Sequence, residues 1–318
     1  MHTNINAELT KLLGAEVDDL QPLSGGCVGE VYRAGLSDGR TVVLKSAQPG
    51  THEAQGLDIE GKMLVYLNQH SDLPVPEVLA RADGALVMQC LDSGGGLGAQ
   101  VQKDAAQHVA KLHNITTDQG FGFDFDTVIG GLHQPNPWTV AWIDFFRDQR
   151  LMFLGHDAER SGRMPTALLN RLDRFCSQLD RWIHEPDRPS LIHGDMWSGN
   201  VLSAKGRITG FIDPAIYFGH AEIELAFSTM FSTFGQPFFA QYQQHRPIQP
   251  GFFEERLDIY NLYPLLVHVR LFGGSYVSSV ERTLKKFGFF LAYHSKPHKT
   301  PFEMMTTRSR CQRHLEWA

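Results

Sequence analysis

Residues 191–202 read LIHGDMWSGNVL, and the interpretation of the whole chain starts from this stretch. The apolar runs at its two ends predict short buried strands, and the residues between them predict a tight turn. Asp195 and Asn200 stand five positions apart in that turn. A carboxylate there can accept a proton from a hydroxyl group, and an amide oxygen can bind a magnesium ion. We prefer this interpretation to a surface turn with a capping Asp and an Asn at a strand start.

A second carboxylate follows at the end of the next apolar run. RITGFID, residues 207–213, predicts a strand that ends in Asp213. The order Asp195, Asn200, strand, Asp213 is the order of the catalytic loop and the metal-binding Asp in kinase-like phosphotransferases. We therefore predict that Asp195 accepts or positions the acceptor hydroxyl, and that Asn200 and Asp213 bind Mg²⁺.

The residues that would hold the nucleotide phosphates are predicted upstream. TVVLK, residues 41–45, predicts a strand with Lys45 at its end, where the ammonium can reach the α- and β-phosphates of ATP. The helical spacing over residues 52–69 offers Glu53 and Glu60 as partners for this lysine. Glu60 is preferred because it lies in the middle of the predicted helix.

A glycine-rich turn, SGGCVG at residues 24–29, predicts the cover over the phosphates, because Gly25 and Gly26 let the backbone approach them closely. The turn matches neither a dinucleotide-binding motif nor a P-loop. Cys27 at its tip is a candidate redox thiol, since nearby amides and a lysine would lower its pKa; the alternative is an inert small residue. The predicted hinge, whose backbone would bind the adenine edge, is Met88, Gln89, Cys90 and Leu91.

The order of predicted elements favours an α+β, two-lobed, protein-kinase-like fold. Residues 1–91 predict a mostly antiparallel sheet and form the expected nucleotide-binding lobe. DSGGGLG, residues 92–98, predicts a flexible linker into a mainly helical catalytic and substrate lobe, residues 92–287. Residues 288–318 are basic, lack a clear period and predict an atypical, poorly ordered tail.

Composition excludes several classes of function. The formal net charge of −6 argues against a nucleic-acid-binding protein, and the 318 residues contain no apolar run long enough for a membrane span. The first residues do not predict a secretory signal. The four cysteines have no paired spacing, so we expect neither a zinc site nor a disulfide framework. Unpaired cysteines suit a reducing compartment, so we expect a cytoplasmic location.

Four segments together resemble the fructosamine kinase (ketosamine-3-kinase) family, which belongs to the aminoglycoside phosphotransferase group: GGCVGEVYR, HGDMWSGN, IDPAIYFGHAEIELAF and LYPLLVHVRLFGG. The resemblance covers about residues 15–287. It implies ATP-dependent phosphorylation of the sugar 3-hydroxyl of ketosamines, either free or on glycated proteins. The unstable product releases the amine, a reaction called deglycation. Glu224 stands where related proteins usually carry Asp.

Aromatic and polar residues beside the two acidic motifs predict the sugar pocket. Trp197 follows the catalytic turn, and Tyr217 and His220 follow Asp213. Aromatic faces can pack on sugars while polar edges bind hydroxyls. Trp138 and Trp142, four apart in a predicted helix over residues 137–154, are assigned to core packing instead.

Alternative functions remain open. The same chemistry on an aminoglycoside, choline or another hydroxyl compound is the nearest, and a catalytically inactive nucleotide-binding module is a more distant one. A protein kinase is disfavoured, because no Ala-Pro-Glu follows Asp213 and Pro214 replaces the Phe-Gly of an activation segment.

Overall fold

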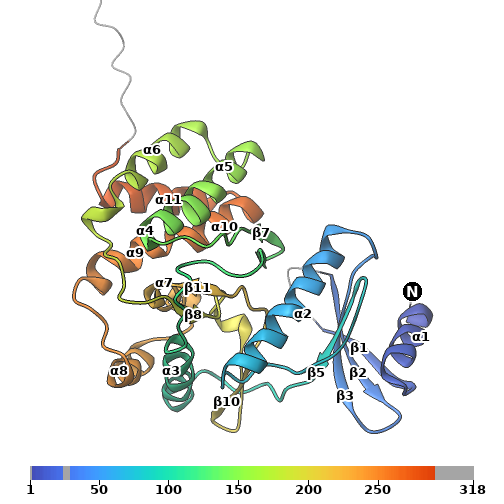
Figure 1. Cartoon of the computed structure of the whole chain (residues 1–318). Coiled ribbons are helices and arrows are strands. Elements are labelled where there is room, and N and C mark those ends of the chain that lie inside the picture. Colours follow the sequence, from blue (N-terminus) through green and yellow to red (C-terminus); the bar gives the residue numbers. More distant parts are fainter. Residues whose placement is uncertain (1, 24–28, 291–318) are drawn as a thin grey trace, which may run out of the picture.

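The computed structural model describes residues 2–23 and 29–290, which form two lobes (Figure 1). Over these residues the smaller lobe is a five-stranded antiparallel sheet with two helices, and the larger lobe is mainly helical with three two-stranded sheets. The predicted α+β, kinase-like architecture is therefore confirmed.

The sheet of the small lobe has the strand order β1-β2-β3-β5-β4. Its strands are β1 (Val17–Pro22), β2 (Glu30–Leu36), β3 (Thr41–Ser46), β4 (Val78–Ala82) and β5 (Ala85–Gln89). A hairpin turn at Asp38–Gly39 joins β2 to β3. Because neighbouring residues of a strand face opposite sides, β3 buries Val42 and Leu44 on one face and directs Lys45 to the other.

Two helices cover the two faces of this sheet. α1 (His2–Leu13) buries Leu9 with Val42 and Leu44, whereas α2 (His52–His70) packs against the opposite face. A glycine in the middle of α2, Gly61, permits this packing, since a Cβ there would lie 2.4 Å from the side chain of Arg81. The close approach of helix and sheet thus explains why α2 contains a glycine in its middle, although glycine lowers the stability of a helix there.

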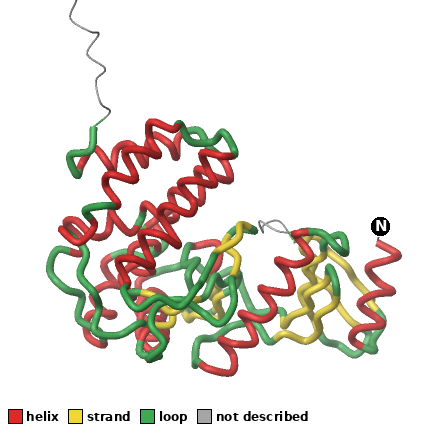
Figure 2. Tube along the Cα trace, turned by 45° about the horizontal axis from the view of Figure 1, so that its top comes forward, coloured by secondary structure: helices red, strands yellow, loops and turns green. Residues whose placement is uncertain are grey.

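The large lobe holds most of the helices, and Figure 2 shows its short strands gathered in the middle of the molecule. The α-helices are α3 (Ala99–His113), α4 (Trp142–Phe145), α5 (Phe153–Arg160), α6 (Thr166–Cys176), α7 (Ala221–Phe227), α8 (Gln236–His245), α9 (Leu257–Tyr260), α10 (Leu262–Phe272) and α11 (Ser275–Lys286). The π- and 3₁₀-helical turns are η1 (Phe146–Met152), η2 (Leu179–Arg181), η3 (Ser198–Asn200), η4 (Met230–Ser232) and η5 (Phe252–Arg256). The strand pairs are β6 (Thr127–Ile129) with β7 (Leu132–Gln134), β8 (Ser190–Ile192) with β11 (Tyr217–Gly219), and β9 (Val201–Ala204) with β10 (Arg207–Phe211).

Two local predictions need correction. The helix expected over residues 137–154 begins only at Trp142, because prolines at 135 and 137 favour extended backbone, so Trp138 lies before the helix. The glycine-rich linker docks on the β9–β10 hairpin, where the Gly95 N–H donates to the Ser203 carbonyl at 2.8 Å.

The chain after α11 is described only as far as Phe290. The carbonyl of Phe289 accepts hydrogen bonds from the guanidinium of Arg171, and its ring packs against Phe175. These residues therefore belong to the packed lobe, and residues 291–318 of the predicted tail lie outside the described residues.

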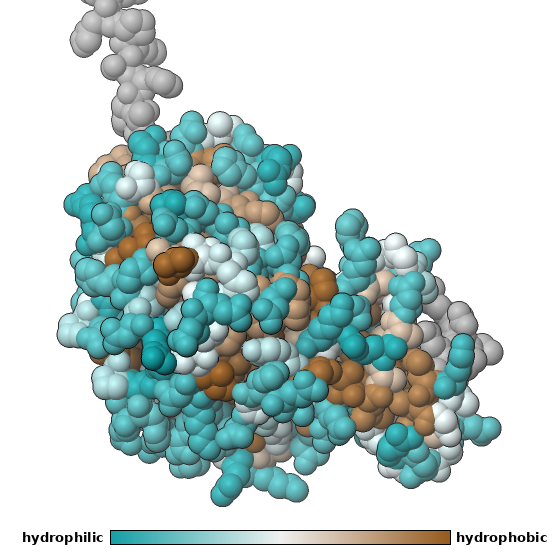
Figure 3. Space-filling model, viewed as in Figure 1, coloured by the Kyte–Doolittle hydropathy of each residue, from teal (hydrophilic) through white to brown (hydrophobic). Residues whose placement is uncertain are grey.

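The outer surface is mostly hydrophilic on the face seen in Figure 3, with an apolar patch over the small lobe. Among the described residues, no helix combines the length and the hydropathy that crossing a bilayer requires.

The core of the large lobe yields a stability prediction. Trp142 is fully buried, stacks on Phe146 and donates its indole N–H to the Tyr260 hydroxyl at 3.1 Å. Trp142→Ala should lower the free energy of unfolding by about 3–5 kcal/mol, measured by chemical denaturation. Val140 is 93% exposed, so Val140→Ala should stay within about 0.5 kcal/mol. Equal effects of the two substitutions would contradict this packing.

Candidate active site

A three-residue ion cluster joins the two lobes. Lys45 from β3 donates to Glu60 Oε1 of α2 at 2.7 Å and also to Asp213 Oδ1 from the large lobe. Burial alone would lower the pKa of Lys45, but the carboxylates of Glu60 and Asp213 outweigh it and raise the pKa. The lysine is therefore charged. Glu53, the alternative partner, is exposed in the first turn of α2.

Asp195 and Asn200 lie together in the predicted turn. The Asn200 side-chain amide donates to the backbone carbonyl and to Oδ2 of Asp195, both at 2.9 Å. Burial and the nearby charge of Asp213 raise the pKa of Asp195 to about 8, although the hydrogen bond from Asn200 opposes this shift. Two carboxylates thus face a common region, where a cation would relieve their repulsion.

Asp213 has an uncommon backbone conformation. Its φ of 53° lies in the left-handed region, which a non-glycine residue rarely adopts. The preceding residue, Ile212, donates its N–H to the Asn200 carbonyl at 3.0 Å. This bond ties the two predicted metal ligands to each other, and the φ of Asp213 sets the direction of its carboxylate.

The donor set fits Mg²⁺ bound partly by substrate phosphates. Mg²⁺ usually takes one or two carboxylates from the protein and completes its shell with phosphate oxygens and water. Among residues 2–23 and 29–290, no group of three His, Cys, Asp or Glu side chains could hold a metal by itself. Asn200 and Asp213 therefore suit a nucleotide-bound ion and not a protein-only site.

The catalytic turn packs tightly on the segment after Asp213. Gly194 has a φ of +85°, and a Cβ on it would lie 2.1 Å from the Ala215 carbonyl oxygen. In return, Ala215 donates its N–H to the His193 carbonyl at 2.7 Å. Only glycine fits this position, which explains the Gly in the His-Gly-Asp sequence.

A buried acid supports the turn from behind. Glu224 Oε1 accepts the N–H groups of His193 at 2.8 Å and of Gly194 at 3.0 Å. Its Oε2 accepts from His113 Nε2 at 2.7 Å, and His113 Nδ1 accepts from the Tyr242 hydroxyl at 2.7 Å. Burial lowers the pKa of His113 although Glu224 opposes this, so a neutral imidazole fits both bonds.

This support was not predicted from the sequence. Glu224 stood out there only as a departure from related proteins, and no role was predicted for His113 or Tyr242. The signal available was the pair of acids, Glu222 and Glu224, in the otherwise apolar AEIELAF of α7, where each carboxylate needs a buried partner. His193, which is fully buried, accepts the Asp195 N–H at 3.3 Å through Nδ1 and so also holds the turn.

A second missed residue is Arg150, which is fully buried in the π-helical turn η1. It donates to the Pro135 carbonyl at 2.7 Å and to Asn136 Oδ1 at 2.6 Å. Its guanidinium lies 3.9 Å from the centroid of the Tyr217 ring. Arg150 therefore fixes the position of β11 beneath the site, and nothing in the local sequence distinguishes it from a surface arginine.

The predicted nucleotide residues are placed only in part. Gly25, Gly26 and Cys27 lie outside the described residues, so their role stays a prediction. Met88 is buried on β5. Gln89 uses its N–H within the sheet, donating to the Glu77 carbonyl at 2.8 Å. The Gln89 N–H is therefore not free for an adenine edge, and the role of the hinge residues Met88, Gln89, Cys90 and Leu91 stays a prediction.

The predicted sugar-binding residues differ in exposure. Tyr217 is 1% exposed and packs in the core, so its ring does not reach the surface of the site and the substrate assignment was wrong. His220 caps α7, accepting the Glu222 N–H at 3.1 Å, and burial lowers its pKa to about 3. Trp197 is half-buried beside the catalytic turn and remains the best placed of the three.

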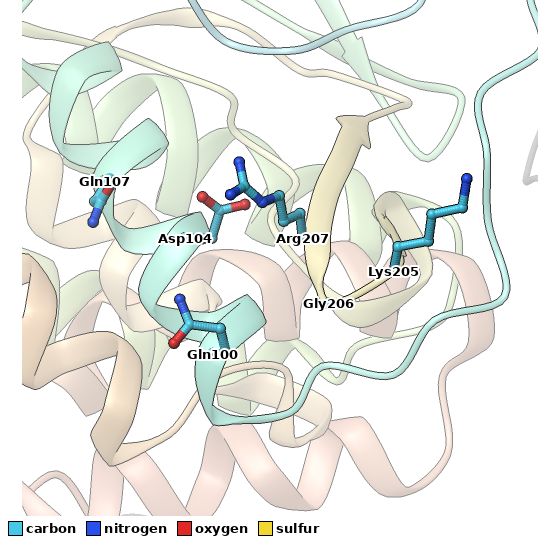
Figure 4. A pocket seen from close by; sticks show the side chains of 6 residues that line it. All are labelled: Gln100, Asp104, Gln107, Lys205, Gly206 and Arg207. Carbon is cyan, nitrogen blue, oxygen red and sulfur yellow. The ribbon is translucent and has the colours of Figure 1, made fainter.

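A polar cavity of about 480 Å³ lies elsewhere on the large lobe (Figure 4). It is formed by α3 and the β9–β10 hairpin and is lined by Gln100, Asp104, Gln107, Lys205, Gly206 and Arg207. Asp104 accepts the Ile208 N–H at 2.8 Å, so its carboxylate holds the hairpin to the helix. None of the predicted site residues lines this cavity, which is therefore separate from the candidate active site.

Comparison with known proteins agrees with this geometry. The family model described as fructosamine kinase matches residues 1–288. The chain belongs to the fructosamine kinase family. A probable ketoamine kinase of Vibrio parahaemolyticus is 32% identical over 284 residues, covering 87% of this chain and 95% of the relative. The chloroplastic protein-ribulosamine 3-kinase of Arabidopsis thaliana is 29% identical over 280 residues, covering 85% and 83%.

The fold is also shared with a solved structure. The crystal structure of a Haemophilus somnus protein assigned as a fructosamine-3-kinase superposes with a TM-score of 0.77 at 26% identity. The match covers 90% of this chain and 97% of that protein. The kinase-like arrangement of both lobes is therefore common to the two chains.

The support behind the catalytic turn can be tested in the active kinase. Glu224→Ala leaves two buried N–H groups unpaired and should lower kcat for ATP turnover by about 10- to 100-fold. Glu224→Gln keeps one oxygen for the same N–H groups and should retain most of the activity. The KM for ATP should be unchanged in both folded variants. A folded Glu224→Ala variant with normal kcat would contradict the positioning role.

Proposed function

We propose that the protein is an ATP- and Mg²⁺-dependent kinase that phosphorylates the sugar 3-hydroxyl of ketosamines such as fructosamines. The observation that carries the proposal is the cluster of Lys45, Glu60 and Asp213 across the two lobes, with Asp195 and Asn200 beside it. Lys45 would be the fixed cation, Asp195 the proton acceptor, and Asn200 and Asp213 the oxygen ligands of a metal. Phosphoryl transfer requires these three functions.

The small lobe, residues 1–91, would bind the nucleotide. The Lys45 ammonium, held by Glu60, would contact the α- and β-phosphates. Gly25 and Gly26 would cover the phosphates with backbone N–H groups, and the hinge would bind the adenine edge. The large lobe, residues 92–287, would supply the catalytic residues and the acceptor pocket.

Asn200 and Asp213 would hold the Mg²⁺ ion through their side-chain oxygens. When bound, the ion neutralises charge on the phosphates and so favours departure of ADP. The hydrogen bond between Ile212 and Asn200 keeps these two ligands in a fixed relation.

Asp195 would receive the proton of the acceptor hydroxyl. Its Oδ2 is oriented by the hydrogen bond from Asn200, and a carboxylate held in this way can accept a proton late in a loose transition state. The hydroxyl oxygen then bonds to the γ-phosphorus while the bond to the β-phosphate oxygen breaks. The products are ADP and a ketosamine 3-phosphate, whose breakdown releases the amine.

The acceptor class follows from the family and from the site. The relatives are named for ketoamines and for ribulosamine on protein, and the half-buried Trp197 beside Asp195 offers an aromatic face to a sugar. The proposal includes both free ketosamines and ketosamines attached to a protein. We infer a cytoplasmic location from the unpaired cysteines Cys90 and Cys176.

The acid–base role of Asp195 gives a direct prediction. Asp195→Asn keeps the size of the side chain but removes the proton acceptor, so kcat should fall by about 10²- to 10⁴-fold. Binding of ATP, followed by fluorescence of a nucleotide analogue, should be unchanged. Near-normal turnover in this variant would show that another group takes the proton.

The acceptor is tested with purified protein, Mg²⁺ and ATP. A fructosamine should stimulate release of ADP, and ³¹P and ¹³C NMR should place the phosphate on the sugar 3-oxygen. Omission of Mg²⁺ should abolish the signal. Turnover with choline or an aminoglycoside, together with none on any ketosamine, would overturn the proposal in favour of another acceptor.

A further inference from the structure

An aromatic strip continues from the catalytic turn across the large lobe. We define it as Trp197, Phe231, His268 and Tyr276, which come from the turn, η4, α10 and α11. The ring centroids of Trp197 and Phe231 are 5.9 Å apart, those of Phe231 and His268 are 5.3 Å apart, and those of His268 and Tyr276 are 4.8 Å apart. The contacts are continuous, so the strip begins two residues after Asp195.

The strip is accessible to a ligand along its length. Phe231 is 48% exposed, and the other three rings are partly exposed. The Trp197 ring folds over its own turn, since a Cβ on Gly199 would lie 2.4 Å from the indole. One side of Trp197 is thus occupied by the turn, while its contact with Phe231 extends an aromatic surface outward from the site.

The backbone at Phe231 is held in a costly conformation. Phe231 has φ 54° and ψ 22°, and Ser232 has φ 57°, so two consecutive non-glycine residues lie in the left-handed region. The segment is anchored on both sides: Asn261 donates to the Thr229 hydroxyl at 3.3 Å, and Phe234 is buried. Backbone strain of this kind persists where the surrounding structure enforces it, often at ligand sites. Here it points a large apolar ring outward beside the catalytic turn.

The charge along the strip suits a cationic ligand. The Nδ1–H of His268 donates to the Pro264 carbonyl at 2.7 Å, and burial lowers the pKa of this histidine, so the ring is neutral at pH 7. The amine of a ketosamine is protonated at that pH, and aromatic faces attract such cations. In a ketosamine this amine is attached to C1, and the keto carbon C2 is the only atom between C1 and C3. With the 3-hydroxyl at Asp195, the amine is therefore close to the first ring of the strip.

We propose that Phe231, together with Trp197 and His268, forms a subsite for the group attached to the ketosamine nitrogen, and that it favours carriers with an apolar or aromatic group next to that nitrogen. This inference rests on the proposed function and deepens it. The sugar and the phosphates occupy the cleft, and the carrier lies along the aromatic strip. Phe231 contacts no atom that reacts, so it determines specificity and not chemistry.

The test compares two acceptors that share the sugar and the charged amine. They are 1-deoxy-1-methylamino-fructose and 1-deoxy-1-benzylamino-fructose. The wild-type kcat/KM for the benzyl compound should exceed that for the methyl compound by about 5- to 10-fold, through KM. Phe231→Gly removes the ring and relieves the backbone strain, so the variant folds and the ratio should fall to near one. Phe231→Tyr should keep the wild-type ratio.

The matched control is Phe253, which is equally exposed at 48% but packs on Phe239 and Phe252 instead of Trp197. Phe253→Ala should keep the wild-type ratio. An unchanged ratio in Phe231→Gly, or a wild-type ratio of one, would overturn the subsite while leaving the kinase assignment intact. No turnover with either ketosamine would overturn the proposed function and the subsite together.

Discussion

The contact on which the active site depends is the bond between Lys45 and Asp213, because it is made by one charged residue from each lobe. Lys45 is 6% exposed, and a buried ammonium is tolerated only beside compensating carboxylates. Glu60 supplies one of these from its own lobe, and Asp213 supplies the other across the cleft. Loss of either acid would remove one of the two carboxylates that hold the ammonium in place. The ion cluster therefore holds the Lys45 side chain in a fixed position and holds the two lobes together at this point.

The rear of the site is held by polar groups of a different kind. Glu224 accepts hydrogen bonds from two backbone N–H groups of the predicted catalytic turn. The side chain of His113 on α3 in turn holds the Glu224 carboxylate by a hydrogen bond. Arg150 holds β11 through carbonyl oxygens and the face of Tyr217. The candidate catalytic turn is thus held from behind by several buried hydrogen bonds.

Local patterns predicted the front of the site well, and long-range packing decided the rest. Lys45 and Asp195 stand in short segments whose strand and turn character can be read directly, so their placement needed no knowledge of distant residues. His113 lies 111 positions from its carboxylate partner, and no local pattern joins them. Arg150 looks like any helical arginine. Tyr217 follows the metal-binding loop as a sugar-binding residue would, yet its ring is buried by segments that only folding brings together.

The close approach of Gly194 to Ala215 has a consequence for how such an enzyme can diversify. The turn that holds Asp195 and the segment after Asp213 contact each other backbone to backbone, with no side chain between them to absorb a change. They therefore shift as one rigid piece or not at all. A change of acceptor is therefore easier to accommodate in a peripheral segment such as η4, which takes no part in this backbone contact.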